Sequence, residues 1–197
     1  MSDFKRLKLL LEERGISIPT EKWARLEAYK SLLLLWGSRF ALVSRRDLKE
    51  GLEKHFADSL LISPYVEGRH ILDLGSGAGF PGIPLAIVLD EKKFTLVESR
   101  RKKCVFLREV RRELGLENLE VVNARWEDLR YEADLALARA TGSTEELLDE
   151  LPHLLKEGSY LLLYSADKRP ELLPDRIEII ENPYRTAPFY LLFFRRD

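Results

Sequence analysis

The chain has 197 residues, of which 45% are hydrophobic and 33% are charged, and its formal net charge is −1 at pH 7. This length suits one domain with a substantial hydrophobic core and a short extension. The near-zero net charge excludes a global attraction to nucleic acid, so any such binding must come from a local patch. The single cysteine, Cys104, excludes an internal disulfide framework and a cysteine-based zinc cluster.

The N-terminal segment, residues 1–15, is not typical of a membrane protein. Its leucines alternate with lysine, arginine and glutamate, unlike the apolar run of a signal peptide or a membrane span. Together with the single cysteine, this pattern favours a cytoplasmic protein with no membrane partner. We also expect a monomer and no bound metal ion.

Apolar residues recur at helical spacing through the first third of the chain, and no strand pattern accompanies them. A helix that starts at Thr20 should stop at Gly37, and the next should begin near Asp47. Residues 1–65 are therefore predicted to form an N-terminal helical extension. Residues 66–197 are predicted to form the main domain.

Strands and helices alternate in the main domain, which predicts an α/β fold with a mostly parallel sheet. Strands are expected at 70–74, 94–98, 119–123, 134–138 and 159–164, with helices at 83–89, at 100–114 and after Ser143. Only a short turn separates the last two strands, 176–181 and 189–194, so they should form an antiparallel hairpin. A Rossmann dehydrogenase would continue with a crossover helix, whereas a class I S-adenosylmethionine (SAM) methyltransferase ends its seven-stranded, Rossmann-like sheet in such a hairpin.

The segment from His70 to Gly82, HILDLGSGAGFPG, joins a strand to a helix through closely spaced glycines. Such a loop lets the backbone approach a ligand that a Cβ atom would hit. Its spacing fits two cofactors. Gly77, Gly79 and Gly82 match the dinucleotide pattern GxGxxG, and Asp73 to Gly79 match the DxGxGxG motif of class I SAM methyltransferases.

Acidic residues and prolines around the glycine loop favour SAM over a nicotinamide or flavin cofactor. The Asp73 carboxylate can orient the methionine amino group, directly or through water, and would repel a pyrophosphate. Pro81 and Pro84 indicate a broader loop than the dinucleotide turn. Glu98 ends the second strand, where an acid accepts both ribose hydroxyls of either cofactor, so it does not discriminate.

The segments after the third and fourth strands supply further candidates. Trp126 can stack on the adenine while Glu127 or the backbone reads its exocyclic amine, or the tryptophan can simply close the core. Base N6 and N4 methyltransferases carry Asn/Asp-Pro-Pro-aromatic after the fourth strand, where this chain has Arg139-Ala140-Thr141. Arg139 can hold guanine O6, a phosphate or the SAM carboxylate, and a structural arginine is the alternative.

The lack of an Asn/Asp-Pro-Pro-aromatic motif after the fourth strand indicates what kind of atom accepts the methyl group. An exocyclic amine needs acceptors that free its lone pair, whereas guanine N7 carries no proton and has an in-plane lone pair. N7 can therefore attack a methyl group without a general base, so that positioning alone can serve catalysis. Asn182-Pro183-Tyr184 looks similar to the missing motif, but it falls in the final hairpin turn and is interpreted as turn chemistry.

The helix after Glu98 is rich in positive charge, with Arg100, Arg101, Lys102 and Lys103 in succession. This density on a nearly neutral protein predicts an RNA-binding face. A solvated helix face is the alternative.

These residues resemble those of the bacterial small-subunit rRNA guanine-N7 methyltransferases, the RsmG (GidB) family, over nearly the whole chain. The most specific matches are KHFADSL at 54–60, similar to HxxDSL, and DLGSGAGFPGIP at 73–84, very close to DxGSGaGfPGiP. Glu98-Ser99 with Lys102-Lys103, Arg125 to Glu127, and Arg139-Ala140 also fit.

The resemblance implies SAM contacts at Gly75, Phe80, Trp126, Glu127 and Arg139. It also implies methylation of a guanine N7 in 16S rRNA, within the small ribosomal subunit or its precursor. The alternatives are a small-molecule SAM methyltransferase and a non-catalytic rRNA-binding or assembly protein.

The sequence departs from the family pattern in two places that bear on the substrate side. Ala41-Leu42-Val43 replaces Asn-Leu-Thr, and a lysine expected after the fifth strand is missing around Tyr164-Ser165-Ala166. The motif residues His55, Asp58 and Ser59 either face the pocket or pack the helical extension against the sheet.

Overall fold

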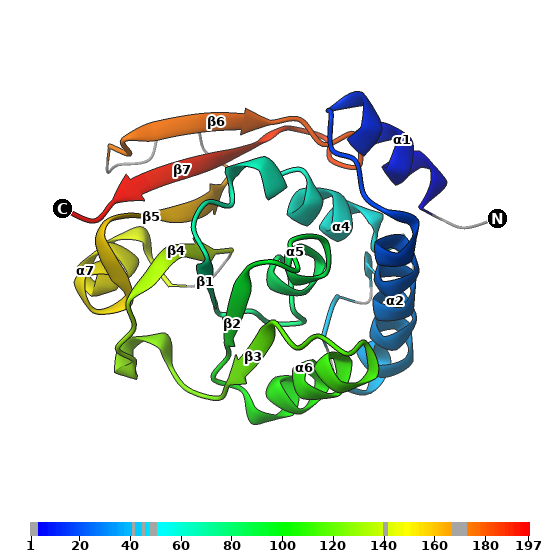
Figure 1. Ribbon diagram of the computed structural model, residues 1–197, viewed down its shortest axis with the longest axis horizontal. Coiled ribbons are helices and arrows are strands. Elements are labelled where there is room, and N and C mark those ends of the chain that lie inside the picture. Colours follow the sequence, from blue (N-terminus) through cyan, green and yellow to red (C-terminus); the bar gives the residue numbers. More distant parts are fainter. Residues whose placement is uncertain (1–3, 41, 45, 48–50, 140–141, 167–172) are drawn as a thin grey trace.

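A seven-stranded mixed sheet forms the centre of the molecule, with strand order β3-β2-β1-β4-β5-β7-β6 (Figure 1). The computed structural model describes residues 4–40, 42–44, 46–47, 51–139, 142–166 and 173–197. The strands are β1 (His70–Leu74), β2 (Lys93–Val97), β3 (Leu119–Val122), β4 (Ala133–Ala138), β5 (Leu155–Ser165), β6 (Arg176–Ile180) and β7 (Phe189–Arg195). Strands β1 to β5 are parallel, and β7 lies antiparallel between β5 and β6. The predicted α/β fold and its closing hairpin are confirmed.

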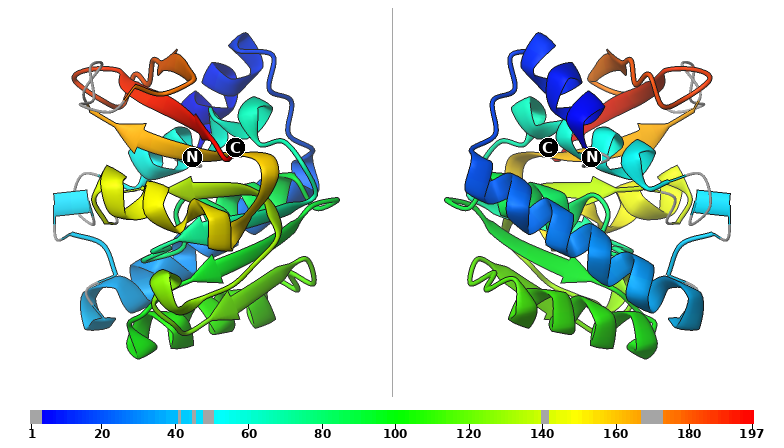
Figure 2. Two further views of the ribbon diagram at one scale, coloured as in Figure 1. Left: turned by 90° about the vertical axis from the view of Figure 1, so that its left-hand side faces the viewer. Right: turned by 90° about the vertical axis from the view of Figure 1, so that its right-hand side faces the viewer.

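Helices cover both faces of this sheet (Figures 1 and 2). They are α1 (Lys5–Glu13), α2 (Thr20–Phe40), α4 (Glu53–Leu60), α5 (Gly82–Val88), α6 (Arg101–Glu113) and α7 (Thr144–Leu154), with short 3₁₀ turns η1 (Ser63–Tyr65) and η2 (Trp126–Asp128). Side chains alternate along the strands, so Ile71 packs in the cluster that contains α1, α2, α4, α5 and α6, and Leu72 packs in the cluster that contains α7. Among the described helices, none is both long and apolar enough to cross a membrane.

One predicted helix boundary is wrong. Helix α2 continues through Gly37 to Phe40, because Gly37 does not adopt the positive φ that ends a helix, and the Trp36 and Phe40 rings stack at 5.1 Å across it. Residues 46–47 are helical, in agreement with the predicted start near Asp47, but Gly51 has φ +102° and breaks the helical backbone, so that α4 begins separately at Glu53. Residues 48–50 lie outside the described residues.

The start of α7 follows the sequence closely. The Ser143 hydroxyl accepts a hydrogen bond from the Glu146 backbone N–H at 3.2 Å, and the Glu146 carboxylate accepts one from the Ser143 N–H at 2.9 Å. This capping box satisfies two backbone donors that the helix leaves free.

The N-terminal helices share a core with the sheet. Phe4 and Phe56 belong to the same buried cluster as Ile71 of β1 and Phe106 of α6. The division at residue 65 thus stays a prediction about sequence organisation, while the apolar packing is continuous across it.

Candidate cofactor and substrate site

The glycine loop leaves β1 at the edge of the sheet where the parallel strands end. Gly75 and Gly77 adopt φ of 67° and 60°, in the left-handed region that favours glycine. A Cβ atom on Gly77 would come within 4 Å only of the Gly75 carbonyl oxygen and of Lys103 Nζ, each at 3.8 Å. The space beside the loop is therefore open, as close approach by a ligand requires.

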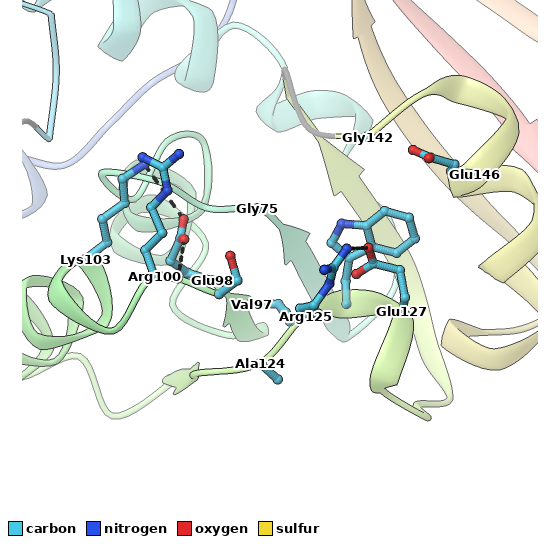
Figure 3. Close-up of a pocket in the computed structure, with 12 residues that line it drawn as sticks. Gly75, Val97, Glu98, Arg100, Lys103, Ala124, Arg125, Glu127, Gly142 and Glu146 are labelled. Atoms are coloured by element: carbon cyan, nitrogen blue, oxygen red, sulfur yellow. Dashed lines mark hydrogen bonds and ion pairs between the residues drawn. The ribbon is translucent and has the colours of Figure 1, made fainter.

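A cavity of about 760 Å³ lies at this edge, beyond the carboxyl ends of β1, β2 and β3 (Figure 3). Its lining residues are Gly75, Val97, Glu98, Ser99, Arg100, Lys103, Ala124, Arg125, Trp126, Glu127, Gly142 and Glu146. Ligands of open α/β sheets bind in this position. Within the described residues, no group of histidine, cysteine or acidic side chains could hold a metal ion.

Glu98 follows β2 and forms part of the cavity wall, although only 5% of its surface is exposed. One carboxylate oxygen accepts a hydrogen bond from the Gly77 N–H at 2.9 Å, and the other accepts one from the Arg100 N–H at 2.7 Å. Lys103 Nζ lies 4.0 Å from Glu98 Oε2. Backbone donors and a nearby cation thus fix the orientation of the carboxylate, which keeps lone pairs for hydroxyl donors of a ligand.

Asp73 lies in β1 behind the glycine loop and is almost completely buried. Its Oδ2 accepts a hydrogen bond from the Gly82 N–H at 3.0 Å, whereas Oδ1 is buried and has no hydrogen-bond partner among the described residues. Burial raises the pKa of Asp73 to about 6, opposed by the Gly82 hydrogen bond and by the positive charge of Arg139. Asp73 does not line the cavity, but its unpartnered oxygen fits the need of a ligand ammonium group, reached directly or through water.

The position of Trp126 is compatible with both roles considered from the sequence. It lies in η2, has 7% of its surface exposed, and belongs to the cluster that packs under α7. It also lines the cavity, beside Glu127, whose carboxylate pairs with Arg125 at 2.9 Å. In Figure 3 the Arg125–Glu127 pair lies across the cavity from Glu98 and Lys103.

Arg139 follows β4 and lies beside the cavity rather than on its wall. Ala138 pairs with Leu74, so the register places the next residue, Arg139, near the start of the glycine loop. The guanidinium carbon is 5.5 Å from the centre of the Phe80 ring. The Phe80 side chain is buried against Tyr29 and Phe56 and does not reach the cavity wall.

A family model described as rRNA small subunit methyltransferase G matches residues 22–181. The chain belongs to this family. Proteins named Ribosomal RNA small subunit methyltransferase G from Shigella flexneri and from Pasteurella multocida (strain Pm70) are each 38% identical to it. The matches span 179 and 174 residues, which are 88% and 85% of this chain and 86% and 83% of those proteins.

Solved structures share the fold at lower identity. A SAM-dependent methyltransferase from Aquifex aeolicus is 20% identical with a TM-score of 0.56, over 79% of this chain and 96% of that one. A SAM-dependent O-methyltransferase from Thermotoga maritima is 20% identical with a TM-score of 0.55, over 71% and 64%. These similarities support the class I methyltransferase fold of this member of the methyltransferase G family.

The four basic residues predicted to bind RNA divide into two pairs in this family member. Arg100 and Lys103 line the cavity, and Lys103 is only half-buried beside Glu98. Arg101 and Lys102 are exposed and do not line it. The first pair can therefore act on a cofactor, whereas the second pair is free to meet a larger partner.

The family motif at 54–60 packs helix α4 rather than lining the cavity. The Asp58 carboxylate is bonded to Arg185 and Asn182 of the loop between β6 and β7. The Ser59 hydroxyl donates to the His55 carbonyl of its own helix at 2.8 Å. Burial, and then the charge of Arg139, lower the pKa of His55, whose Nε2 is 3.3 Å from Asp47 Oδ2.

The two departures from the family pattern are placed unequally. Ala41 lies outside the described residues, and Val43 packs against the main core. Ser165 ends β5, and Ala166 lines a second cavity of about 400 Å³ beside the β6–β7 loop. No local pattern indicated a role for Arg185, because its partner on α4 is 127 positions away.

Proposed function

We propose that the chain is a SAM-dependent methyltransferase that methylates N7 of a guanine in 16S rRNA, in the small ribosomal subunit or its precursor. One observation carries the proposal. A chain of the methyltransferase G family has a cavity at the carboxyl ends of β1 to β3, and a carboxylate fixed by two backbone donors stands in its wall. The names of the relatives, which describe them as small-subunit rRNA methyltransferases, support the substrate class.

The residues around the cavity fit the parts of SAM. The Glu98 carboxylate accepts hydrogen bonds from the ribose hydroxyls, and Trp126 flanks the adenine beside Glu127. Gly75 and Gly77 present backbone that no Cβ atom covers, and the free Asp73 oxygen attracts the methionine ammonium group. SAM, when bound, supplies a methyl group activated for direct transfer.

Alignment of the guanine base by the protein is sufficient for methyl transfer to N7. The chain has Arg139-Ala140-Thr141 where amine-directed enzymes carry an acceptor motif, so it offers nothing there to free an exocyclic amine. Guanine N7 needs no such help, and a guanidinium that holds O6 or a neighbouring phosphate aligns the base. We assign this role to Arg139, because it lies next to the glycine loop and makes no hydrogen bond within the described part of the chain.

RNA binding is assigned to the exposed residues Arg101 and Lys102 of α6. Positive side chains there can pair with backbone phosphates without disturbing the cavity. A small-molecule methyltransferase would not need them. We further propose that the protein is a cytoplasmic monomer without a membrane partner, which light scattering and cell fractionation would test.

Two measurements test the proposal. Mass-spectrometric mapping of 16S rRNA from cells with and without the protein should show one N7-methylguanine lost in its absence, and unchanged modification would contradict the assignment. Calorimetry should show binding of SAM and none of NAD. Arg139→Ala should abolish transfer to the subunit. A non-catalytic rRNA-binding protein would give neither SAM binding nor a lost methyl group.

A further inference from the structure

We propose that Asp58 is the residue that positions Arg139, and that Arg185 sets how tightly it does so. This inference rests on the role given to Arg139 in the proposed function. It assigns a place in the methyl transfer reaction to the aspartate of the HxxDSL-like segment, which does not line the cavity.

The Asp58 carboxylate is fully buried between three parts of the chain. Arg185, in the loop between β6 and β7, donates to both of its oxygens, from Nε and from Nη2, each at 2.7 Å. Asn182 of the same loop donates to Oδ1 at 2.7 Å. The planar, two-bond pairing with Arg185 and the Asn182 hydrogen bond supply the direct hydrogen bonds that compensate the buried charge.

Arg139 approaches the same carboxylate but does not bond to it. Its Nη1 is 3.9 Å from Asp58 Oδ2, beyond hydrogen-bond length. The guanidinium carbon also lies over the Phe80 ring, 5.5 Å from the ring centre. A negative charge and an aromatic face thus both attract the guanidinium, while its N–H groups make no hydrogen bond within the described residues and remain available to a substrate.

Charge effects on neighbouring groups agree with this placement. Burial raises the pKa of Tyr29 and of Tyr164, and the Arg139 charge opposes the rise in both. Tyr29 donates to the carbonyl of Ala78 in the glycine loop, and Tyr164 donates to the carbonyl of Asp58. The Arg139 charge therefore lies close to two tyrosines, one bonded to the glycine loop and the other bonded to α4.

Arg139 and Arg185 both approach the Asp58 carboxylate. Loss of Asp58 and weakening of Arg185 should therefore each change the position of Arg139. Without the Asp58 charge, Arg139 loses the ion pair at 3.9 Å that draws it toward α4, and with it a defined position. With a weaker partner at position 185, Oδ2 has one hydrogen bond fewer and draws Arg139 from 3.9 Å into direct hydrogen-bond contact. Both changes misplace the same guanidinium, in opposite directions.

A purely structural role of Asp58, as a joint between α4 and the β6–β7 loop, predicts a different result. Its removal would lower stability and would reduce activity only through unfolding. A matched control is available on the same helix, because Lys30 and Glu53 form a largely buried ion pair at 2.6 Å between α2 and α4. Lys30→Gln weakens the attachment of α4 without touching the Asp58 carboxylate.

The test uses the full chain with SAM and small subunits from cells that lack the protein, at a temperature where circular dichroism shows every variant folded. Asp58→Asn should slow single-turnover methyl transfer at least about tenfold, because misplaced positioning groups cost this much or more. Its SAM dissociation constant by calorimetry should stay within about twofold of wild type, by the same distinction between positioning and binding. Lys30→Gln should lower the melting temperature and keep the transfer rate.

Arg185→Lys keeps the charge but loses the two-bond pairing, and it supplies a second arm if Asp58→Asn does not fold. It should also slow transfer while leaving SAM affinity unchanged. The proposal is overturned if folded Asp58→Asn transfers at the wild-type rate. It is equally overturned if Arg185→Lys does so, or if Lys30→Gln loses as much rate as either.

Arginine side-chain NMR separates failure of this inference from failure of the proposed function. The Nε–Hε signal of Arg139, assigned by its loss in Arg139→Ala, should report a rigid side chain in the wild type and in Lys30→Gln. The same signal should report a mobile side chain in Asp58→Asn. If wild type transfers no methyl group to the subunit, the proposed function fails, yet this signal still decides whether Asp58 positions Arg139.

Discussion

Replacing Asp73 by asparagine should remove a specific part of the pH dependence of stability. Burial raises the pKa of this carboxyl from 3.8 to about 6 in the folded protein. The folded state therefore favours the protonated form, and the resulting stability is fully present below pH 3.8 and lost as the pH rises through about 6. Between pH 5 and pH 7.5 this one group should lower the free energy of unfolding by about 1.4 kcal/mol.

The assay is urea denaturation of wild type and Asp73→Asn at several pH values between 5 and 7.5. Burial lowers the pKa of His55 and of His70, so these groups contribute stability that falls as the pH drops below about 6.5, opposite in sign to Asp73. Only the difference between the two proteins isolates Asp73. Parallel curves for wild type and Asp73→Asn would refute the reasoning.

SAM binding should change the protonation of the Asp73 carboxyl group. If the free Asp73 oxygen attracts the SAM ammonium group, binding favours the ionised carboxylate and releases protons. At pH 6 the release should be about half a proton, and SAM should bind about tenfold more weakly at pH 5 than at pH 7. Calorimetry in buffers of different ionisation enthalpy measures the release, and His55→Asn should retain it. An affinity independent of pH over this range would contradict a role for Asp73 in binding.

Three further variants, the first with a matched control, test the site. Gly82→Ala should lower the free energy of unfolding by about 1–3 kcal/mol in denaturation, because the new Cβ would lie 2.5 Å from Asp73 Oδ2. The control Gly115→Ala should lower it by about 1 kcal/mol, because Gly115 has φ +59° but open space around it. Trp126→Ala should cost about 3–5 kcal/mol and also weaken SAM binding in calorimetry, since the ring serves both core and cavity. Arg101→Glu with Lys102→Glu should abolish methylation of the subunit and leave SAM affinity within about twofold, because the two exposed charges meet only the phosphate backbone; retained methylation would contradict the RNA-binding role.

The kinds of element and the directions of the strands were predictable because each element carries its own pattern. Alternation of strand and helix gave the parallel sheet, and the short turn before residue 189 left only an antiparallel hairpin. The capping box at Ser143 was readable for the same local reason. The predicted helix end at Gly37 was wrong because a glycine ends a helix in this way only where its backbone adopts positive φ, which Gly37 does not. The stacked rings of Trp36 and Phe40 support the helix on both sides of Gly37.

The pairing of Asp58 with Arg185 could not have been predicted from local pattern. The two residues are 127 positions apart in the sequence. Asp58 lies on a helix and Arg185 lies in a loop, and neither segment has a pattern that indicates the other. The motif around Asp58 indicated that the residue matters, and left open whether it faces the pocket. The fold answers this by bringing the β6–β7 loop over α4, which no periodicity in either segment encodes.

The division of the basic helix, by contrast, was available in the sequence. Residues three apart lie on the same side of a helix, so Arg100, just before α6, and Lys103 share one direction, while Arg101 and Lys102 turn away from it. Because the strand before the helix ends at Val97, the first direction is toward the ligand edge of the sheet. One run of four cations thus supplies two cations to the cavity wall and two to the surface. A variant at Lys103 would therefore disturb Glu98 and the cavity wall, whereas variants at Arg101 and Lys102 change only the exposed pair.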